Sequence, residues 1–168
     1  GREKRQRIIL VKIPPGLDDG SQIRLSGEGE AGTRGGPSGN LYVTLSVIPH
    51  QFFTRDNDDI LYVLPVNFAQ AALGAEVEVP TLDGKTKLKV PAGSQTGKVF
   101  RLKAQGIPHL HRGGRGDQLV TLFVVTPDSL TKKQRHLFEE LANSLTSANM
   151  PSERWKGWLD RLKDVFGA

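Results

Sequence analysis

The sequence predicts a mainly β protein: two tandem small antiparallel β-sandwich domains followed by C-terminal α-helices. Three observations predict this fold class. The 19 glycines and 10 prolines among 168 residues favour many turns and short strands. One motif occurs twice at a fixed spacing, and after Pro127 the apolar residues change from alternating to helical spacing. We therefore divide the chain into residues 1–49, 50–127 and 128–168.

The composition limits the classes of function. Hydrophobic residues make up 37% of the chain, which is enough to bury a core. The absence of cysteine excludes disulfides and thiolate metal sites within this sequence. No apolar run approaches the roughly 20 residues that cross a membrane, so we expect no membrane span. The net charge is +5, and the basic run at residues 2–7 could either contact phosphate or remain solvated.

An internal repeat is the most informative feature. The stretch VKIPPGLDDGSQIRLSGEGEAG, residues 11–32, returns as LKVPAGSQTGKVFRLKAQGIPH, residues 88–109. The offset from Gly16 to Gly93 is 93 − 16 = 77, and no gap is needed to keep the glycines in register. Chance does not account for such agreement at one ungapped offset, so we infer an internal duplication.

We call residues 8–47 copy one and residues 85–124 copy two. Each contains a short alternating strand, a glycine-rich loop and a second alternating strand. In copy one, Ile23 and Leu25 alternate with polar residues, which predicts that both point inward. The β-branched run at residues 8–16, which ends in Pro-Gly, predicts a further strand before this pair.

The segment between the copies predicts three elements. Residues 60–66 are apolar and β-branched, which predicts a strand. The stretch NFAQAALG predicts one short helix that is capped by Asn67 and ends at Gly74. The Asp83-Gly84 pair lies between two alternating runs and predicts a hairpin turn.

Two amphipathic helices are predicted after residue 127. The first has Thr131 as its predicted N-cap, and its apolar residues at helical spacing are Leu137, Phe138, Leu141 and Leu145. The second follows Ser152 and carries the stripe Trp155, Trp158, Leu159, Leu162, Val165 and Phe166. This stripe could be buried against its own chain, another subunit or a membrane surface, and the mixed charges of its polar face argue against the membrane.

The sequence predicts neither a catalytic site nor a metal site. His109 and His111 share a loop with Arg112 and Arg115, but two histidines without a nearby carboxylate or cysteine are a weak metal signal. The Gly-rich stretches lack the Lys-Ser/Thr ending of a phosphate-binding loop. No serine occupies a nucleophile elbow. We therefore expect a protein that is not an enzyme and that holds no cofactor in this chain.

The sequence resembles the C-terminal region of bacterial DnaJ proteins, which are J-domain co-chaperones. The stretches that carry the resemblance are VKIPPGLDDGSQIRLSGEGEAG, GNLYVTLSVIPHQFFTRDNDDILYVLPVNFAQAALGAEVEVPTLDG and VPAGSQTGKVFRLKAQGIP, and it covers residues 2 to about 145. In that family an HxxFxR motif and an acidic turn start the second β-domain. The matching residues here are His50, Phe53 and Arg55, followed by DNDD.

The resemblance implies a function. Members of this family bind unfolded or partly folded polypeptides and deliver them to a DnaK-type ATPase chaperone during protein folding and the stress response, which implies a cytoplasmic protein. The resemblance also implies a homodimer formed through the C-terminal segment. The J-domain and the Cys-rich zinc modules do not occur in this sequence, so zinc is expected only in that missing region. Because those modules are inserted in the first β-domain, we expect that domain to lack its first strand or two.

The resemblance also implies site residues. A client segment is expected to add a strand to a sheet edge and to place its side chains in an apolar pocket. By its position in the motif Phe53 is the first candidate for client binding, followed by Ile23 and Leu25, although one face of any sandwich strand can be core. The residues assigned to dimerisation are Leu137, Phe138, Leu141, Trp155, Trp158 and Leu162.

Two other classes of function remain open at this point. The main alternative is a basic β-module that binds nucleic acid, which requires Lys and Arg on one face and a steep salt dependence. A β-sandwich hydrolase or carbohydrate-binding module needs a cleft with acids or stacked aromatic rings. Aromatic residues make up only 7% of the chain, which disfavours that module.

Overall fold

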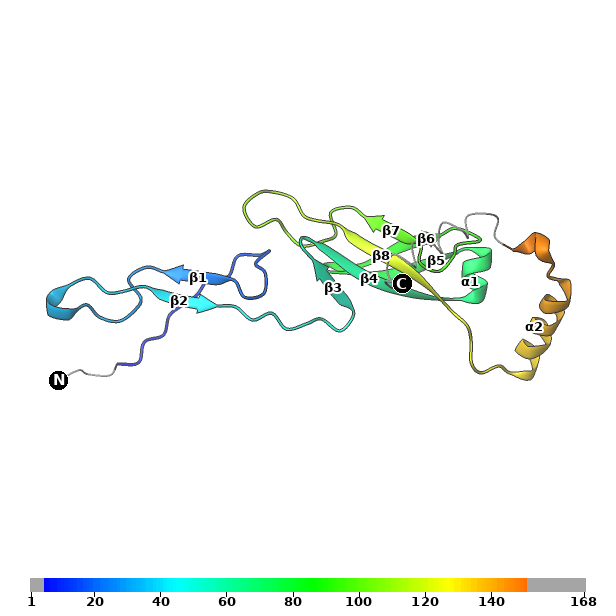
Figure 1. The fold of residues 1–168 in the computed structure, drawn as a ribbon, viewed down its shortest axis with the longest axis horizontal. Coiled ribbons are helices and arrows are strands. Elements are labelled where there is room, and N and C mark those ends of the chain that lie inside the picture. Colours follow the sequence, from blue (N-terminus) through cyan, green and yellow to red (C-terminus); the bar gives the residue numbers. More distant parts are fainter. Residues whose placement is uncertain (1–4, 151–168) are drawn as a thin grey trace, which may run out of the picture. The chain divides into compact units, whose positions relative to one another are not determined.

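The structure, a computed structural model, describes residues 5–150. Backbone contacts divide the chain into two compact units, Gly1–Thr126 and Pro127–Ala168. The first unit contains all the described strands, and the second contains α2 (Lys132–Ser144) (Figure 1). The predicted second amphipathic helix, with Ser152, Trp155, Trp158 and Leu162, lies outside the described residues.

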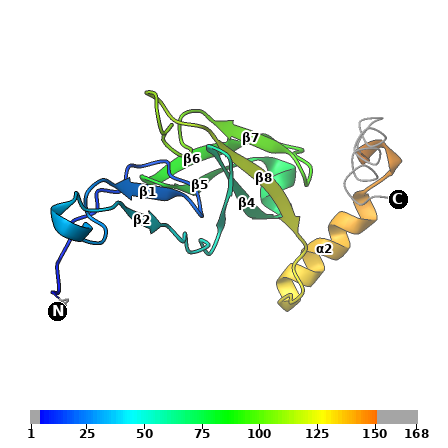
Figure 2. The same ribbon diagram turned by 60° about the vertical axis from the view of Figure 1, so that its left-hand side comes forward.

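A four-stranded sheet forms the centre of the second β-domain, residues 50–127. Its order is β3 (Phe53–Asp56), β4 (Asp59–Asn67), β8 (Gln118–Val125) and β7 (Val99–Leu102) (Figures 1 and 2). The strands β5 (Ala75–Thr81) and β6 (Gly84–Val90) pair separately as an antiparallel hairpin. The strand expected at residues 60–66 and the hairpin at Asp83-Gly84 are both confirmed.

The short helix α1 (Phe68–Leu73) joins β4 to the β5–β6 hairpin. The Asn67 side chain accepts a hydrogen bond from the Gln70 backbone N–H, and the Gln70 side chain accepts one from the Asn67 backbone N–H. Gly74 ends the helix at a φ of +81°, a conformation that favours glycine. Both predicted helix boundaries are therefore confirmed.

One strand pair differs from the antiparallel arrangement that the sequence predicts. The strands β4 and β8 are parallel, with Ile60 opposite Gln118 and Val66 opposite Val124. Parallel neighbours require a long crossover connection, and here residues 68–117 provide one. Alternation within each strand predicts which face is buried, but it does not reveal the direction of the neighbouring strand.

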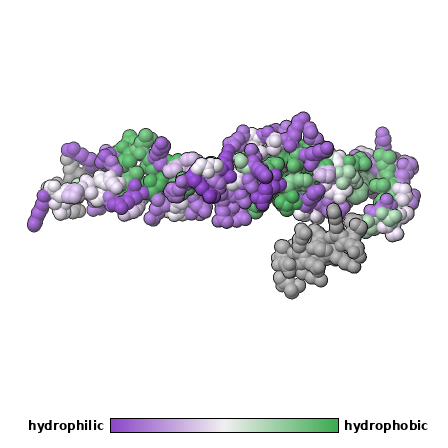
Figure 3. Space-filling model, turned by 90° about the horizontal axis from the view of Figure 1, so that it is seen from above, coloured by the Kyte–Doolittle hydropathy of each residue, from purple (hydrophilic) through white to green (hydrophobic). Residues whose placement is uncertain are grey.

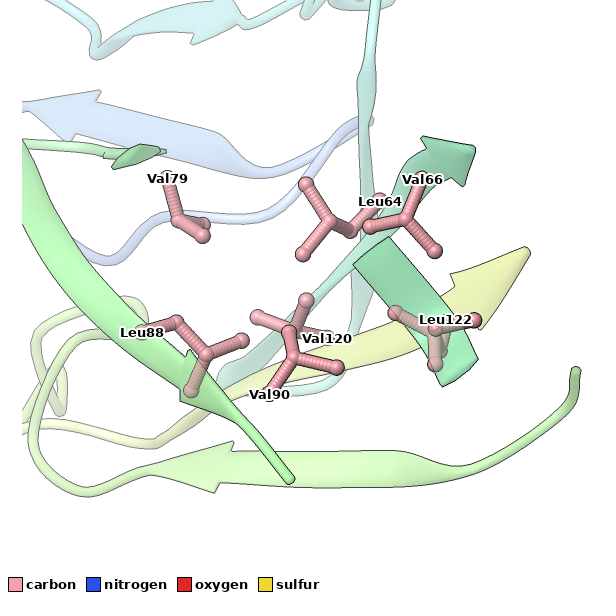
Figure 4. Packing of buried hydrophobic residues seen from close by; sticks show 8 residues of the cluster. Leu64, Val66, Val79, Leu88, Val90, Val120 and Leu122 are labelled. Atoms are coloured by element: carbon pink, nitrogen blue, oxygen red, sulfur yellow. The ribbon is translucent and has the colours of Figure 1, made fainter. Parts of the chain in front are cut away.

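The hydrophobic core lies between the four-stranded sheet and the β5–β6 hairpin (Figure 4). The core residues are Leu64, Val66, Ala71, Val79, Leu88, Val90, Val120 and Leu122. Val79, Val120 and Leu122 have no exposed surface. The second β-domain is therefore a two-layer sandwich with its own core, as predicted.

The internal duplication is confirmed by the strand register. Copy one contains β1 (Gln22–Leu25) and β2 (Leu41–Thr44), and Ile23 pairs with Val43. In copy two Phe100 pairs with Val120, which is the same register after subtraction of 77. The predicted alternation in β1 is also confirmed. Among residues 5–49, however, none is fully buried, so the described part of the first domain lacks a closed core.

The strand predicted at residues 8–16 is wrong for the described structure, because residues 8–14 have no strand pairing. Its counterpart in copy two is β6, which receives all its ladder bonds from β5. At the offset of 77, the counterpart of β5 ends at 81 − 77 = 4, outside the described residues. An extended segment becomes a strand only when a neighbour supplies its hydrogen bonds.

The helix α2 begins as predicted. The Thr131 side chain accepts a hydrogen bond from the Gln134 backbone N–H, and the Gln134 side chain accepts one from the Thr131 backbone N–H. On this helix Leu137 is 53% exposed, and Phe138 and Leu141 are 36% and 38% exposed. Two short 3₁₀ turns, Thr33–Gly35 and Ser147–Asn149, complete the described elements.

The core of the second β-domain is expected to depend strongly on Leu122. Leu122→Ala removes a fully buried side chain and should lower the free energy of unfolding by about 2–5 kcal/mol. Its repeat counterpart Leu45 is only half-buried, so Leu45→Ala should cost less than about 2 kcal/mol. Urea unfolding followed by circular dichroism measures both variants. Equal losses in the two variants would contradict the assignment of the core to the second domain.

Candidate functional site

The HxxFxR motif builds an aromatic cluster where β3 begins. His50 Nδ1 accepts hydrogen bonds from the backbone N–H groups of Phe52 and Phe53, each at 3.3 Å. The His50 ring centroid lies 4.5 Å from that of Phe52 and 4.8 Å from that of Phe53. The centroid of the Tyr62 ring on β4 lies 6.0 Å from that of Phe52 and 5.9 Å from that of Phe53. The histidine therefore shapes the turn that presents the two phenylalanines.

Within this cluster the two phenylalanines differ in exposure. Phe53, the residue predicted from the motif, is half-buried, while the Phe52 side chain beside it is 48% exposed. The sequence prediction missed Phe52, although two adjacent aromatic residues before a strand were visible in HQFF. A ligand that contacts Phe53 would therefore also meet Phe52.

Ile23 and Leu25 lie on one face of β1 and are half-buried. Their counterparts in copy two, Phe100 and Leu102, pack against the hydrophobic core. This comparison favours a packing role for Ile23 and Leu25 in a completed first domain. Their strand, β1, is nevertheless an edge, because among the described residues it pairs with β2 alone.

The most exposed apolar side chains of copy one lie in the segment before β1. Ile8 is 100% exposed and Leu10 is 95% exposed. At the offset of 77 their counterparts on β6 are Lys85 and Lys87, which form ion pairs of 2.8 Å with Glu78 and 3.0 Å with Glu76. Copy two shows that the fold accepts lysine at these positions, so the fold itself does not require the apolar residues of copy one.

Ile8 and Leu10 therefore mark a candidate binding surface that the sequence prediction missed. The sequence already contained this signal, because the offset of 77 aligns Ile8 with Lys85 and Leu10 with Lys87. Apolar side chains in contiguous exposed patches mark interaction sites more often than scattered ones do. Figure 3 shows that hydrophobic side chains reach the surface in patches on the face that it displays.

A second apolar surface covers the outer face of the four-stranded sheet. Val63 on β4, Val99 on β7 and Phe123 on β8 are 57%, 54% and 52% exposed. They point away from the core because side chains alternate along each strand. This face lies on the second β-domain and provides an internal comparison for binding experiments.

The histidine loop makes a polar contact with the acidic turn after β3. His109 Nδ1 lies 2.6 Å from Asp58 Oδ2, and this contact pairs the loop with the acidic turn after β3. Within residues 5–150 no group of three or more His, Asp or Glu side chains is arranged to hold a metal ion. His109 therefore makes a polar contact between two loops.

One carboxylate organises the end of copy two. Asp117 accepts hydrogen bonds from the Ala104 backbone N–H at 2.9 Å and from the Arg101 guanidinium at 2.7 Å. The backbone bond from Ala104, and then the Arg101 bond, lower the pKa of the Asp117 carboxyl below its usual value. Copy one has Asn40 at this position, and its side-chain oxygen is 3.4 Å from the Gly27 backbone N.

The comparisons with known proteins assign the family. The family described as DnaJ C terminal domain matches residues 2–127, and the chain belongs to this family. The Chaperone protein DnaJ of Roseiflexus sp. strain RS-1 is 53% identical over 166 residues, which are 99% of this chain and 45% of that protein. The Chaperone protein DnaJ of Halalkalibacterium halodurans is 49% identical, over 99% of this chain and 44% of that protein.

The family assignment confirms the resemblance seen in the sequence, and the family is one of chaperones. The chain spans less than half the length of the curated relatives it matches. Among residues 5–150, no helix has the length and apolar character needed to span a membrane.

The stability of copy two is expected to depend on pH through Asp117. A depressed folded-state pKa means that the carboxylate stabilises the fold above its unfolded pKa of about 3.9. This contribution disappears as the pH falls through the folded-state pKa. The urea midpoint of the chain should therefore fall below about pH 4. Asp117→Asn, the residue of copy one, should flatten part of that decline, and an unchanged pH profile would contradict the role of this carboxylate.

Proposed function

We propose that this chain is the client-binding part of a DnaJ co-chaperone, which holds unfolded polypeptide segments for delivery to a DnaK-type ATPase chaperone. Membership of the DnaJ C-terminal family and relatives named Chaperone protein DnaJ support the proposal. The observation that carries it is the contrast between Ile8 and Leu10 in copy one and the ion-paired lysines of copy two. An apolar surface that folding does not require is suited to a partner.

The client is proposed to bind as an added strand beside β1. In copy two the counterpart of β1 is β7, the outermost strand of its sheet, whereas the counterpart of β2 is β8, which has a neighbour on both edges. The outer edge of β1 would thus stay open in a sheet built like that of copy two. Backbone pairing is independent of sequence, which suits a protein that holds many different unfolded chains.

Apolar residues on β1 and on either side of it in the chain are the proposed contacts of the client side chains. Ile23 and Leu25 lie half-buried on β1 itself, so only the part of each side chain that packing leaves exposed would meet a client. Ile8 and Leu10 precede β1, and Phe53 follows in the motif after β2. Apolar contacts of this kind select hydrophobic segments without selecting a particular sequence. Such segments are buried in folded proteins and become accessible when proteins unfold.

The active form is proposed to be a homodimer. The exposed residues Leu137, Phe138 and Leu141 on α2 provide an apolar stripe for a second copy of the chain. The predicted dimer contacts also include Trp155, Trp158 and Leu162, which lie outside the described residues. Two linked binding surfaces would hold one long client more tightly than either surface alone.

The double change Ile8→Lys and Leu10→Lys tests the binding surface. Because copy two carries lysine at both counterpart positions, the fold should tolerate the change. Affinity for a labelled unfolded apolar peptide should fall about tenfold, since two partly buried aliphatic side chains contribute roughly 1.4 kcal/mol. Fluorescence anisotropy measures the affinity.

A matched control is Leu73→Lys, which introduces the same charge at a side chain of α1 that is 79% exposed. The control should bind the peptide like the unchanged chain. Equal affinity of the double variant and the unchanged chain would remove residues 8–10 from the site. Binding of DNA with a steep dependence on salt concentration would favour the nucleic-acid class instead.

Phe53→Leu tests the residue that the motif predicted. Leucine keeps an apolar side chain in the half-buried cluster, whereas a charged residue there would disturb the packing around His50 and Tyr62. Loss of the ring should weaken peptide binding about threefold, because an aromatic contact contributes roughly 0.5–1.5 kcal/mol. Phe123→Leu, on the outer face of the sheet, is the control. A larger effect from Phe123 would relocate the client to that face.

A further inference from the structure

Arg55, the last residue of the HxxFxR motif, connects two parts of the first unit. Its Nη1 donates to the Leu17 carbonyl at 2.8 Å, and its Nη2 donates to the Gly16 carbonyl at 2.9 Å. Its Nε donates to the Asn57 carbonyl, in the turn after β3, at 2.7 Å. One guanidinium thus joins the Pro-Gly turn of copy one to the second β-domain.

Two carboxylates, one on each side of the junction, lie close to the Arg55 guanidinium. Asp18 of copy one has a carboxylate oxygen 3.8 Å from Arg55 Nε, and Asp58 of the second domain has one 3.9 Å from Nη2. The Arg55 side chain is 25% exposed, so solvent screens these interactions only partly. The hydrogen bonds to three carbonyl groups use the fixed fork of arginine, which lysine cannot reproduce.

The turn of copy one also rests closely on a loop of the second domain. Gly16 has a φ of +95°, and a Cβ atom added there would lie 2.3 Å from the Pro108 carbonyl oxygen. The loop is anchored in turn, because the Ile107 backbone N–H donates to the Asp58 carbonyl at 2.7 Å. The contact therefore joins two backbone segments, each of which is held by a hydrogen bond.

Copy two uses the equivalent turn differently. Its Gly93 backbone N–H donates to the Ala71 carbonyl at 2.9 Å, and the following Ser94 is buried, so this turn docks on α1 of its own domain. In copy one, the turn docks on the neighbouring domain instead. Arg55 thus binds the turn of copy one at the junction with the second β-domain, whereas the equivalent turn of copy two is held by α1.

We propose that Arg55 is a positioning residue that fastens copy one to the second β-domain, so that the two copies behave as one rigid body. The chain between β2 and β3, residues 45–52, contains no strand or helix and would otherwise act as a hinge. At the start of this segment, the Leu45 backbone N–H donates to the Ser21 carbonyl at 2.8 Å and the Val47 backbone N–H donates to the Asp19 carboxylate at 2.8 Å, and both bonds lie within copy one. Fixing this junction sets the direction in which the proposed client edge of β1 faces.

Distances between spin labels test the rigidity directly. The sequence has no cysteine, so Tyr42→Cys on β2 and Lys89→Cys on β6 supply two exposed label sites without background. Dilution with unlabelled chain restricts double electron–electron resonance to distances within one molecule. The labelled chain should give one narrow distribution, and Arg55→Ala should roughly double its width, as expected when a fixed interface becomes a hinge.

Two further variants separate positioning from folding. Arg55→Lys keeps the charge and the aliphatic stem, so it should fold normally and still broaden the distribution. Arg101→Ala removes another arginine and its ion pair with Asp117, but that pair lies within copy two, so the distribution should stay narrow. Unchanged widths in both Arg55 variants, with native circular dichroism, would overturn the proposal.

A binding comparison, which rests on the proposed function, distinguishes positioning from a general loss of stability. Arg55→Lys should bind a client with two apolar segments about tenfold more weakly, because a loose junction lowers the effective concentration of the second contact. A peptide with one apolar segment should bind as before. Equal losses for both ligands would overturn the positioning role. If the unchanged chain bound neither ligand, the proposed function would fail while the label distances still tested Arg55.

Discussion

The pairing of each strand with its neighbours decides the structure of this chain. In copy two β8 lies between β4 and β7, and the β5–β6 hairpin covers their inner face. This arrangement buries Val120 and Leu122 completely. In copy one β2 has the same register with β1 but lacks described neighbours on its other edge and a closed layer above it. Two related local sequences therefore yield a core in one place and an open hairpin in the other.

This difference in pairing makes the two copies useful as references for each other. A position that is buried in copy two and half-buried in copy one, such as that of Val43, follows from the missing layer. A position that is exposed in both copies does not contribute to the core, so packing does not explain which residue type is found there. Ile8 and Leu10 belong to the second kind, because their counterparts are solvent-exposed lysines that pair with glutamates. The comparison separates exposed residues that folding does not require from residues that belong to the core.

The HxxFxR motif has two structural roles that its spacing alone does not distinguish. His50 and Phe53 form a local aromatic cluster with Tyr62, where the histidine holds the turn through two backbone hydrogen bonds. Arg55 turns to copy one and joins it to the second domain. The motif thus connects a candidate contact surface to the element that determines how this surface is oriented. A client held at the edge of β1 would depend on both roles.

Residue spacing and direct residue matches were enough to predict the duplication, the alternating strands, the caps at Asn67 and Thr131 and the family. They could not predict the parallel pairing of β4 with β8, since strand direction depends on where a crossover returns. Nor could they predict that residues 8–14 are not a strand or that Arg55 bonds copy one to the second β-domain. The same cause applies in each case. Backbone and guanidinium donors form hydrogen bonds with partners that are distant in sequence, and local residue patterns do not predict which partners these are.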